Sequence, residues 1–152
     1  MWSEFKLVCL TNETASLYIC APCRDTSASR SPRPLCFAPA GHTLGIDCHT
    51  MSVIGPPLAP DPGRKRPLVC ISNGDGTCPE EWINVLARCF ASVFKEKVAI
   101  NKPFRGGYIT RSHGIEMPWV QIEISQTRAY SNAFKRNCVL EVLRRFCHTV
   151  LS

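Results

Sequence analysis

Two short segments of the chain carry side chains whose types and spacing could do chemistry. In residues 46–50, His49 ends a short apolar run, and Asp47 lies two positions before it. In residues 101–124, two arginines and a tyrosine surround a pair of glycines, and Glu123 follows on an alternating stretch. A neutral imidazole can bind a metal, a carboxylate can move protons, and guanidiniums can hold an anionic substrate. This combination is typical of a metal-dependent hydrolase.

Each candidate also has a plain structural interpretation. An isolated histidine such as His49 is more often simply hydrogen-bonded at a strand end, and Asp47 shares its face only if the strand continues. Glu123 alternates with apolar residues, so it is either exposed at a sheet edge or buried with a cation or a proton-transfer role. The Gly106–Gly107 pair could be a hairpin turn, or it could let the backbone approach a ligand.

Composition limits the class of protein. With 152 residues, 45% of them hydrophobic and 20% charged, the chain can form one globular domain with a real core. The net charge of +6 comes from scattered arginines, which favours a solvated surface over a nucleic-acid interface. We therefore expect no nucleic-acid partner, and we also expect no membrane. The arginines that flank the glycine pair, Arg105 and Arg111, favour a small anionic ligand as partner.

Ten cysteines are a high count, but their spacing is irregular. Several fall in expected strands or helices, where a thiol acts as a small buried hydrophobe. Cys20 and Cys23 could form a redox or zinc pair, although no second pair follows at zinc-ribbon spacing. No secretory signal or run of about 20 apolar residues is evident, so we expect a cytoplasmic protein with reduced thiols.

Periodicity predicts alternating strands and helices, which indicates an α/β layered sheet. The spacing Thr77–Glu80 has the form of a capping box before the first helix. The polar, proline-containing stretch Asp25–Pro34 separates a less regular start from the rest. The expected strands are Leu44–Cys48, Leu68–Ser72, Val98–Asn101 and Trp119–Ile124, with short ones at Lys6–Leu10 and Ser16–Cys20, and the helices are Cys78–Lys97 and Asn132–Val150.

Several motifs occur in a specific order between Gly45 and about Tyr130. They are Ile46–Met51, Asp61–Arg64, Gly74–Thr77, Asn101–Arg111, His113–Gly114 and Gln121–Ile124. In this order and at this spacing, the chain resembles the N-formylglutamate amidohydrolase family.

The resemblance implies a three-layer α/β/α fold with a mixed central sheet, of the phosphorylase/hydrolase type and related to the zinc carboxypeptidases. It implies a zinc-dependent cleavage of N-formyl-L-glutamate, or a similar N-acyl amino acid, to formate and glutamate in histidine degradation. His49 would be a zinc ligand with Asp47 beside it, and Glu123 would be the catalytic acid/base. The implied substrate-binding residues are Arg105, Gly106, Gly107, Tyr108 and Arg111.

The N-terminal part departs from the family. No motif with its earlier zinc ligands is found, so we expect residues 1–40 to be a poorly ordered segment foreign to it. Residues 41–152 would be the C-terminal part of an amidohydrolase domain, incomplete at its N-terminus. The alternatives are a non-catalytic remnant of the fold or a cysteine-rich binding module. If the resemblance holds, His49 and Glu123 should lie close together on one face of the sheet.

Overall fold

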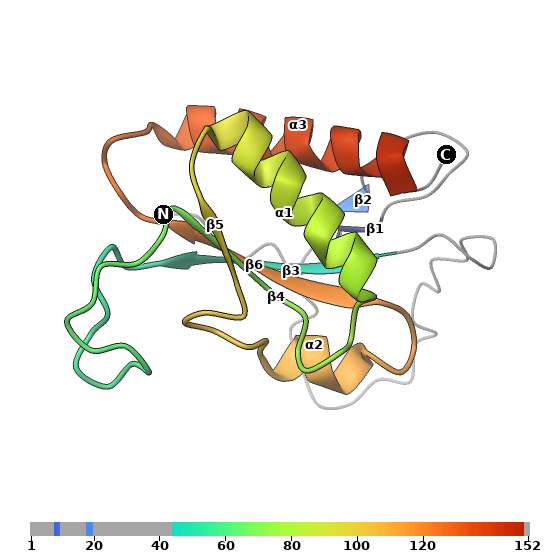
Figure 1. The fold of residues 1–152 in the computed structure, drawn as a ribbon, viewed down its shortest axis with the longest axis horizontal. Coiled ribbons are helices and arrows are strands. Elements are labelled where there is room, and N and C mark those ends of the chain that lie inside the picture. The colour runs from blue at the N-terminus through green and yellow to red at the C-terminus, as the bar shows by residue number, and fades with distance from the viewer. Residues whose placement is uncertain (1–7, 10–17, 20–43, 151–152) are drawn as a thin grey trace, which may run out of the picture.

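The computed structural model describes residues 8–9, 18–19 and 44–150, which form a mixed sheet flanked by helices (Figure 1). Two short strands, β1 (Val8–Cys9) and β2 (Tyr18–Ile19), pair antiparallel and lie within the short strands expected at Lys6–Leu10 and Ser16–Cys20. The expectation of poor order over residues 1–40 otherwise lies outside the described residues.

The main sheet has four strands in the order β3-β6-β4-β5. β3 pairs parallel with β6, β6 pairs antiparallel with β4, and β4 pairs parallel with β5, so the sheet is mixed as predicted. The strands are β3 (Gly45–Met51), β4 (Val69–Ser72), β5 (Val98–Ile100) and β6 (Trp119–Ser125). The four strand predictions in this region are therefore confirmed to within a few residues.

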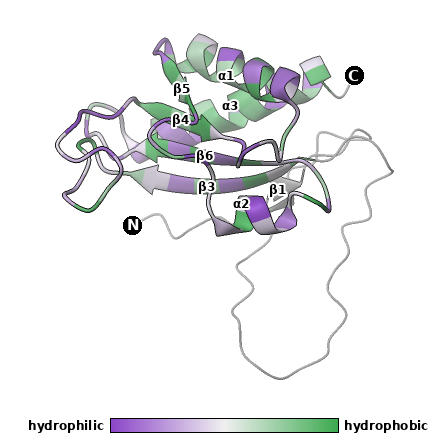
Figure 2. Ribbon diagram, turned by 60° about the horizontal axis from the view of Figure 1, so that its bottom comes forward, coloured by the Kyte–Doolittle hydropathy of each residue, from purple (hydrophilic) through white to green (hydrophobic). Residues whose placement is uncertain are grey.

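Two long helices cover one face of this sheet, and a short helix lies on the other (Figures 1 and 2). α1 (Glu80–Phe94) and α3 (Asn132–Val150) pack against each other, while α2 (Tyr108–His113) contacts β3 and β6. This is the predicted α/β/α arrangement, with a thin third layer.

The apolar core lies between the sheet and the two long helices. Alternate residues of each strand face it, because side chains of a strand point to opposite faces in turn. Fully buried members are Leu44, Ile46, Ile71, Val120, Ile122, Ile83, Leu86, Phe90, Val142 and Phe146. The opposite alternation gives the other face of β3 and β6 most of the polar side chains, together with the buried Trp119.

The predicted capping box at the start of α1 is wrong. The helix begins at Glu80 after Pro79, and no side chain caps it. Thr77 Oγ1 instead lies 2.7 Å from the carbonyl oxygen of Asn73 and 2.8 Å from that of Trp119. The hydroxyl thus ties the turn before the helix to β6, a partner that local sequence spacing does not reveal.

Candidate active site

A row of polar side chains lies along the paired strands β3 and β6. The register places Asp47 opposite Gln121 and His49 opposite Glu123. Paired residues of neighbouring strands point to the same face, and the strand backbones lie about 4.8 Å apart. We call Asp47, His49, Gln121 and Glu123 the polar row. The expectation that His49 and Glu123 are close and share a face is confirmed.

The polar row is held by contacts along each strand. His49 Nε2 lies 2.8 Å from Asp47 Oδ1, and Gln121 Nε2 donates a 2.7 Å hydrogen bond to Glu123 Oε1. Glu123 is 6% exposed, and its strand β6 lies between β3 and β4. The alternative that Glu123 is exposed at a sheet edge is therefore wrong, and its burial requires a chemical explanation.

Burial raises the pKa of Glu123 above its ordinary value. The hydrogen bond from Gln121 and the nearby His49 oppose this increase in pKa, while the negative charge of Asp47 adds to it. Asp47 Oδ1 and Gln121 Oε1 are buried and accept no aligned hydrogen bond within the described part of the chain. The row can therefore accept protons or contacts from an incoming group.

The loop of residues 101–107 is fixed to the end of β4 beside this row. Ser72 Oγ donates a 2.8 Å hydrogen bond to the carbonyl oxygen of Phe104, and Asn101 Nδ2 donates one of 2.9 Å to Asn73 Oδ1. Gly106 has φ +99°, and a Cβ there would lie 2.6 Å from the Gly74 Cα. The glycine is needed both for its backbone angle and for this close approach.

The same loop leads into α2, so the hairpin alternative for the glycine pair is wrong. Gly107 precedes the helix, and a Cβ there would lie 3.1 Å from Gln121 Oε1. The loop therefore passes directly over the polar row. Arg105 and Tyr108 are exposed beside it, and Arg111 is also exposed, with its Nη2 3.2 Å from Asp75 Oδ2. Their role in binding a substrate stays a prediction.

Comparison with known proteins agrees with this fold. The sequence model of the N-formylglutamate amidohydrolase family matches residues 36–129. The chain belongs to this family. The crystal structure of N-formylglutamate amidohydrolase from Ralstonia eutropha JMP134 is similar to the fold, with a TM-score of 0.50 and 22% sequence identity. The similarity covers 68% of this chain and 42% of that one, so the chain spans less than half of that enzyme's length. No curated protein matches the chain.

Family membership raises the question of a metal, and the described residues do not complete a site for one. No group of three His, Cys, Asp or Glu side chains that could hold a metal ion lies within residues 44–150 and the two short strands. A protein zinc site normally has at least three such ligands. His49 and Asp47 supply two side chains of this kind, and His49 Nε2 lies 2.8 Å from Asp47 Oδ1.

Arg66 is a component of this region that the sequence analysis missed. It is 7% exposed, its Nε and Nη2 donate to both oxygens of Asp61 at 2.9 and 2.7 Å, and its Nη1 donates to Ser52 Oγ. Its guanidinium lies 4.8 Å from the centre of the Phe104 ring, and its charge lowers the pKa of Glu123. The solvated-surface interpretation of the arginines is therefore wrong for Arg66.

The sequence contains a signal for Arg66, but the neighbouring basic residues obscure it. It ends the basic run Arg64-Lys65-Arg66, in which a solvated face is the usual expectation. The acidic Asp61 lies five positions earlier, and the buried strand β4 begins three positions later. A cation next to a buried strand needs a partner, and Asp61 supplies it.

Two further predictions concern the cysteines and the membrane. Within residues 44–150 six cysteines are free thiols, and burial raises the pKa of Cys48 and Cys78 to about 12, so these two are neutral. Cys20 and Cys23 lie outside the described residues. In the described part, no helix is both long enough and apolar enough to cross a membrane.

Proposed function

We propose that the chain carries the proton-transfer and substrate-binding side of an amidohydrolase site acting on N-formyl-L-glutamate or a similar N-acyl amino acid. The observation that carries the proposal is the pairing of His49 with Glu123 on one face, with Asp47 and Gln121 beside them. Family membership gives the reaction class. In this reaction water adds to the formyl carbon, the C–N bond breaks, and formate and glutamate leave.

Glu123 is suited to both proton transfers of that reaction. A carboxylate with a raised pKa is a stronger base, and it becomes a useful acid once protonated. It would take a proton from the attacking water and give it to the amine nitrogen as the C–N bond breaks. Gln121 keeps one carboxylate oxygen oriented by its 2.7 Å hydrogen bond.

The loop over the polar row would hold the substrate's carboxylates. Arg105 is exposed and forms no hydrogen bond or ion pair to the described residues, so its guanidinium is available for a carboxylate. Arg111 could exchange its exposed Asp75 partner for a second carboxylate. Tyr108, 84% exposed, could donate a hydrogen bond at the rim.

Zinc is proposed with His49 as one of its ligands, and the further ligands would have to come from outside the described residues. In a complete site the metal would polarise the formyl oxygen and acidify a bound water. If no part of the protein supplies those ligands, a second candidate function applies. The chain would then be a non-catalytic member that binds the acyl amino acid without hydrolysing it, and the observation behind this candidate is that the described residues hold no three-ligand metal group.

Formate release from N-formyl-L-glutamate, with and without added zinc, tests the proposal. Glu123→Gln should lower the rate by about 100-fold or more, since general acid–base catalysis contributes that much. In the wild type the rate should rise as pH increases through the raised pKa of Glu123, because the ionised form is the base.

Glu96→Gln is the matched control, because Glu96 is exposed and lies after α1, away from the polar row. It should leave the rate unchanged. Equal rates for the wild type and Glu123→Gln would overturn the assigned role. No formate release under any condition, together with saturable binding of N-formyl-L-glutamate, would instead establish the non-catalytic candidate.

A further inference from the structure

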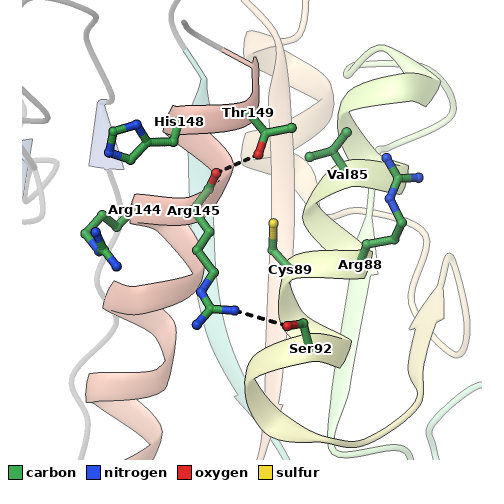
Figure 3. A pocket seen from close by; sticks show the side chains of 8 residues that line it. All are labelled: Val85, Arg88, Cys89, Ser92, Arg144, Arg145, His148 and Thr149. Atoms are coloured by element: carbon green, nitrogen blue, oxygen red, sulfur yellow. Dashed lines mark hydrogen bonds between the residues drawn. The ribbon is translucent and has the colours of Figure 1, made fainter.

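A hollow of about 400 Å³ lies between α1 and α3, on the face of these helices away from the polar row (Figure 3). Cys89 and Val85 of α1 form an apolar floor, and Arg145 and Thr149 of α3 face them across it. Small-molecule sites of proteins begin at about this volume. The remaining lining residues are Arg88, Ser92, Arg144 and His148.

The rim of the hollow is cationic. Among the described residues, its lining holds three arginines and no carboxylate. Glu141, which is not part of the lining, accepts hydrogen bonds from Arg144 and Arg145, so three guanidiniums against one carboxylate leave a net charge of +2. The floor adds no negative charge, because burial raises the pKa of the Cys89 thiol, although Arg145 and Arg88 oppose this. None of the described lining residues repels an anion.

The guanidiniums also keep unused hydrogen-bond donors. Arg145 donates one hydrogen bond from Nε to Glu141 and another, of 3.1 Å, from Nη1 to Ser92 Oγ. Its Nη2 takes part in neither of these hydrogen bonds. Arg88 is exposed on α1 and makes no hydrogen bond or ion pair to any residue in the described ranges. An arginine fixed by its neighbours, with donors left over, presents a pre-ordered site for phosphate oxygens.

In Figure 3 the guanidinium of Arg145 points toward Ser92, and that of the exposed Arg88 points the other way, past Val85. We propose that this hollow binds a small organic phosphate held by Arg145, with Arg88 turning toward the same phosphate and an apolar body on the Val85–Cys89 floor. The site is separate from the polar row, since α1 and α3 cover the opposite face of the sheet. It therefore does not depend on the proposed hydrolase function. Two sources share this chemistry, a nucleotide and a phospholipid headgroup with its first acyl carbons.

Calorimetric titration of the full chain with phenyl phosphate tests the proposal, because this probe joins one phosphate to one apolar ring. Saturable binding with one site per chain is expected, weaker for inorganic phosphate and absent for phenol. Arg88→Gln should weaken phenyl phosphate binding by about tenfold or more, the effect of a lost charge-assisted hydrogen bond. Arg88 holds no described residue in place, so this variant should fold normally.

Arg136→Gln is the matched control, because Arg136 is exposed on α3 but lies on the side of the helix opposite Arg145. It should bind like the wild type. Equal weakening in both variants would show a diffuse charge effect and overturn the proposal, as would failure to bind phenyl phosphate. Tighter binding of adenosine monophosphate than of vesicles containing phosphatidic acid would identify the nucleotide source, and the reverse order the lipid source.

Discussion

Replacing Asp61 with asparagine should destabilise the fold strongly, because it removes the charge that pairs with a buried guanidinium. The Arg66 side chain is 4% exposed and that of Asp61 13%, and two hydrogen bonds of 2.9 and 2.7 Å join them. Breaking a buried pair by removing one partner costs about 3–5 kcal/mol. Because Asp61 retains some contact with solvent, we expect about 3 kcal/mol for Asp61→Asn, at the low end of that range.

The pH dependence of this effect follows from the direction of the pKa shift. The hydrogen bonds from Arg66 hold the pKa of Asp61 below its ordinary value of 3.8. The folded pKa is thus lower than the unfolded one, so the stabilisation is present above the unfolded pKa and lost as pH falls through the folded pKa. The difference between wild type and Asp61→Asn should accordingly be full at pH 7 and shrink in strong acid.

Urea unfolding followed by tryptophan fluorescence measures both effects. Asp75→Asn provides the matched control, since Asp75 also contacts an arginine, but with side chains 66% and 53% exposed. An exposed pair of this kind contributes about 0–1 kcal/mol. A cost below 1 kcal/mol for Asp61→Asn, or equal costs for the two variants, would refute the reasoning, as would a difference from wild type that stays constant down to the lowest pH.

Two further substitutions test the packing and the loop. Phe146→Ala, at a side chain with no exposed surface, should lower the free energy of unfolding by about 3–5 kcal/mol, whereas Phe134→Ala, 43% exposed, should cost clearly less in the same urea assay. Gly106→Ala should lower the free energy of unfolding more than Gly63→Ala does. Equal losses in the two variants would contradict this prediction. Both glycines have positive φ, but a Cβ at Gly106 meets the backbone of Gly74, while one at Gly63 meets nothing within 4 Å.

Local pattern was enough to predict the four strands of the main sheet and the two long helices, with the faces they bury, but it did not predict the short helix α2. The alternation in β6 predicted that Glu123 lies on one face of the strand and the apolar residues Val120 and Ile122 on the other face. The structure has this arrangement. Helical spacing predicted α3 with its observed bounds, Asn132–Val150. α1 is shorter than predicted at its C-terminal end, because Lys95 adopts the left-handed conformation, φ +58°, and stops the helix. Periodicity does not report such a backbone angle.

Contacts between distant residues could not be predicted in this way. Thr77 finds its partner 42 positions away, at Trp119. β3 pairs with β6 although β4, α1, β5 and α2 lie between them in the chain, and this pairing was expected from family resemblance alone. The burial of Arg66 depends on the loop folding back so that Asp61 and Ser52 both reach it. These features are properties of the assembled fold.

One face of the sheet contributes mainly to stability, and the other carries the polar row. The face toward α1 and α3 buries apolar side chains, and its burial drives folding. The face toward α2 buries Asp47, Gln121 and Glu123, which costs free energy because Asp47 Oδ1 and Gln121 Oε1 lack aligned hydrogen bonds in the described part of the chain. Apolar residues at these positions would fold more stably, so their stability cost is best explained by the chemistry of the polar row. That argument favours a retained ligand-binding or catalytic role over a purely structural one.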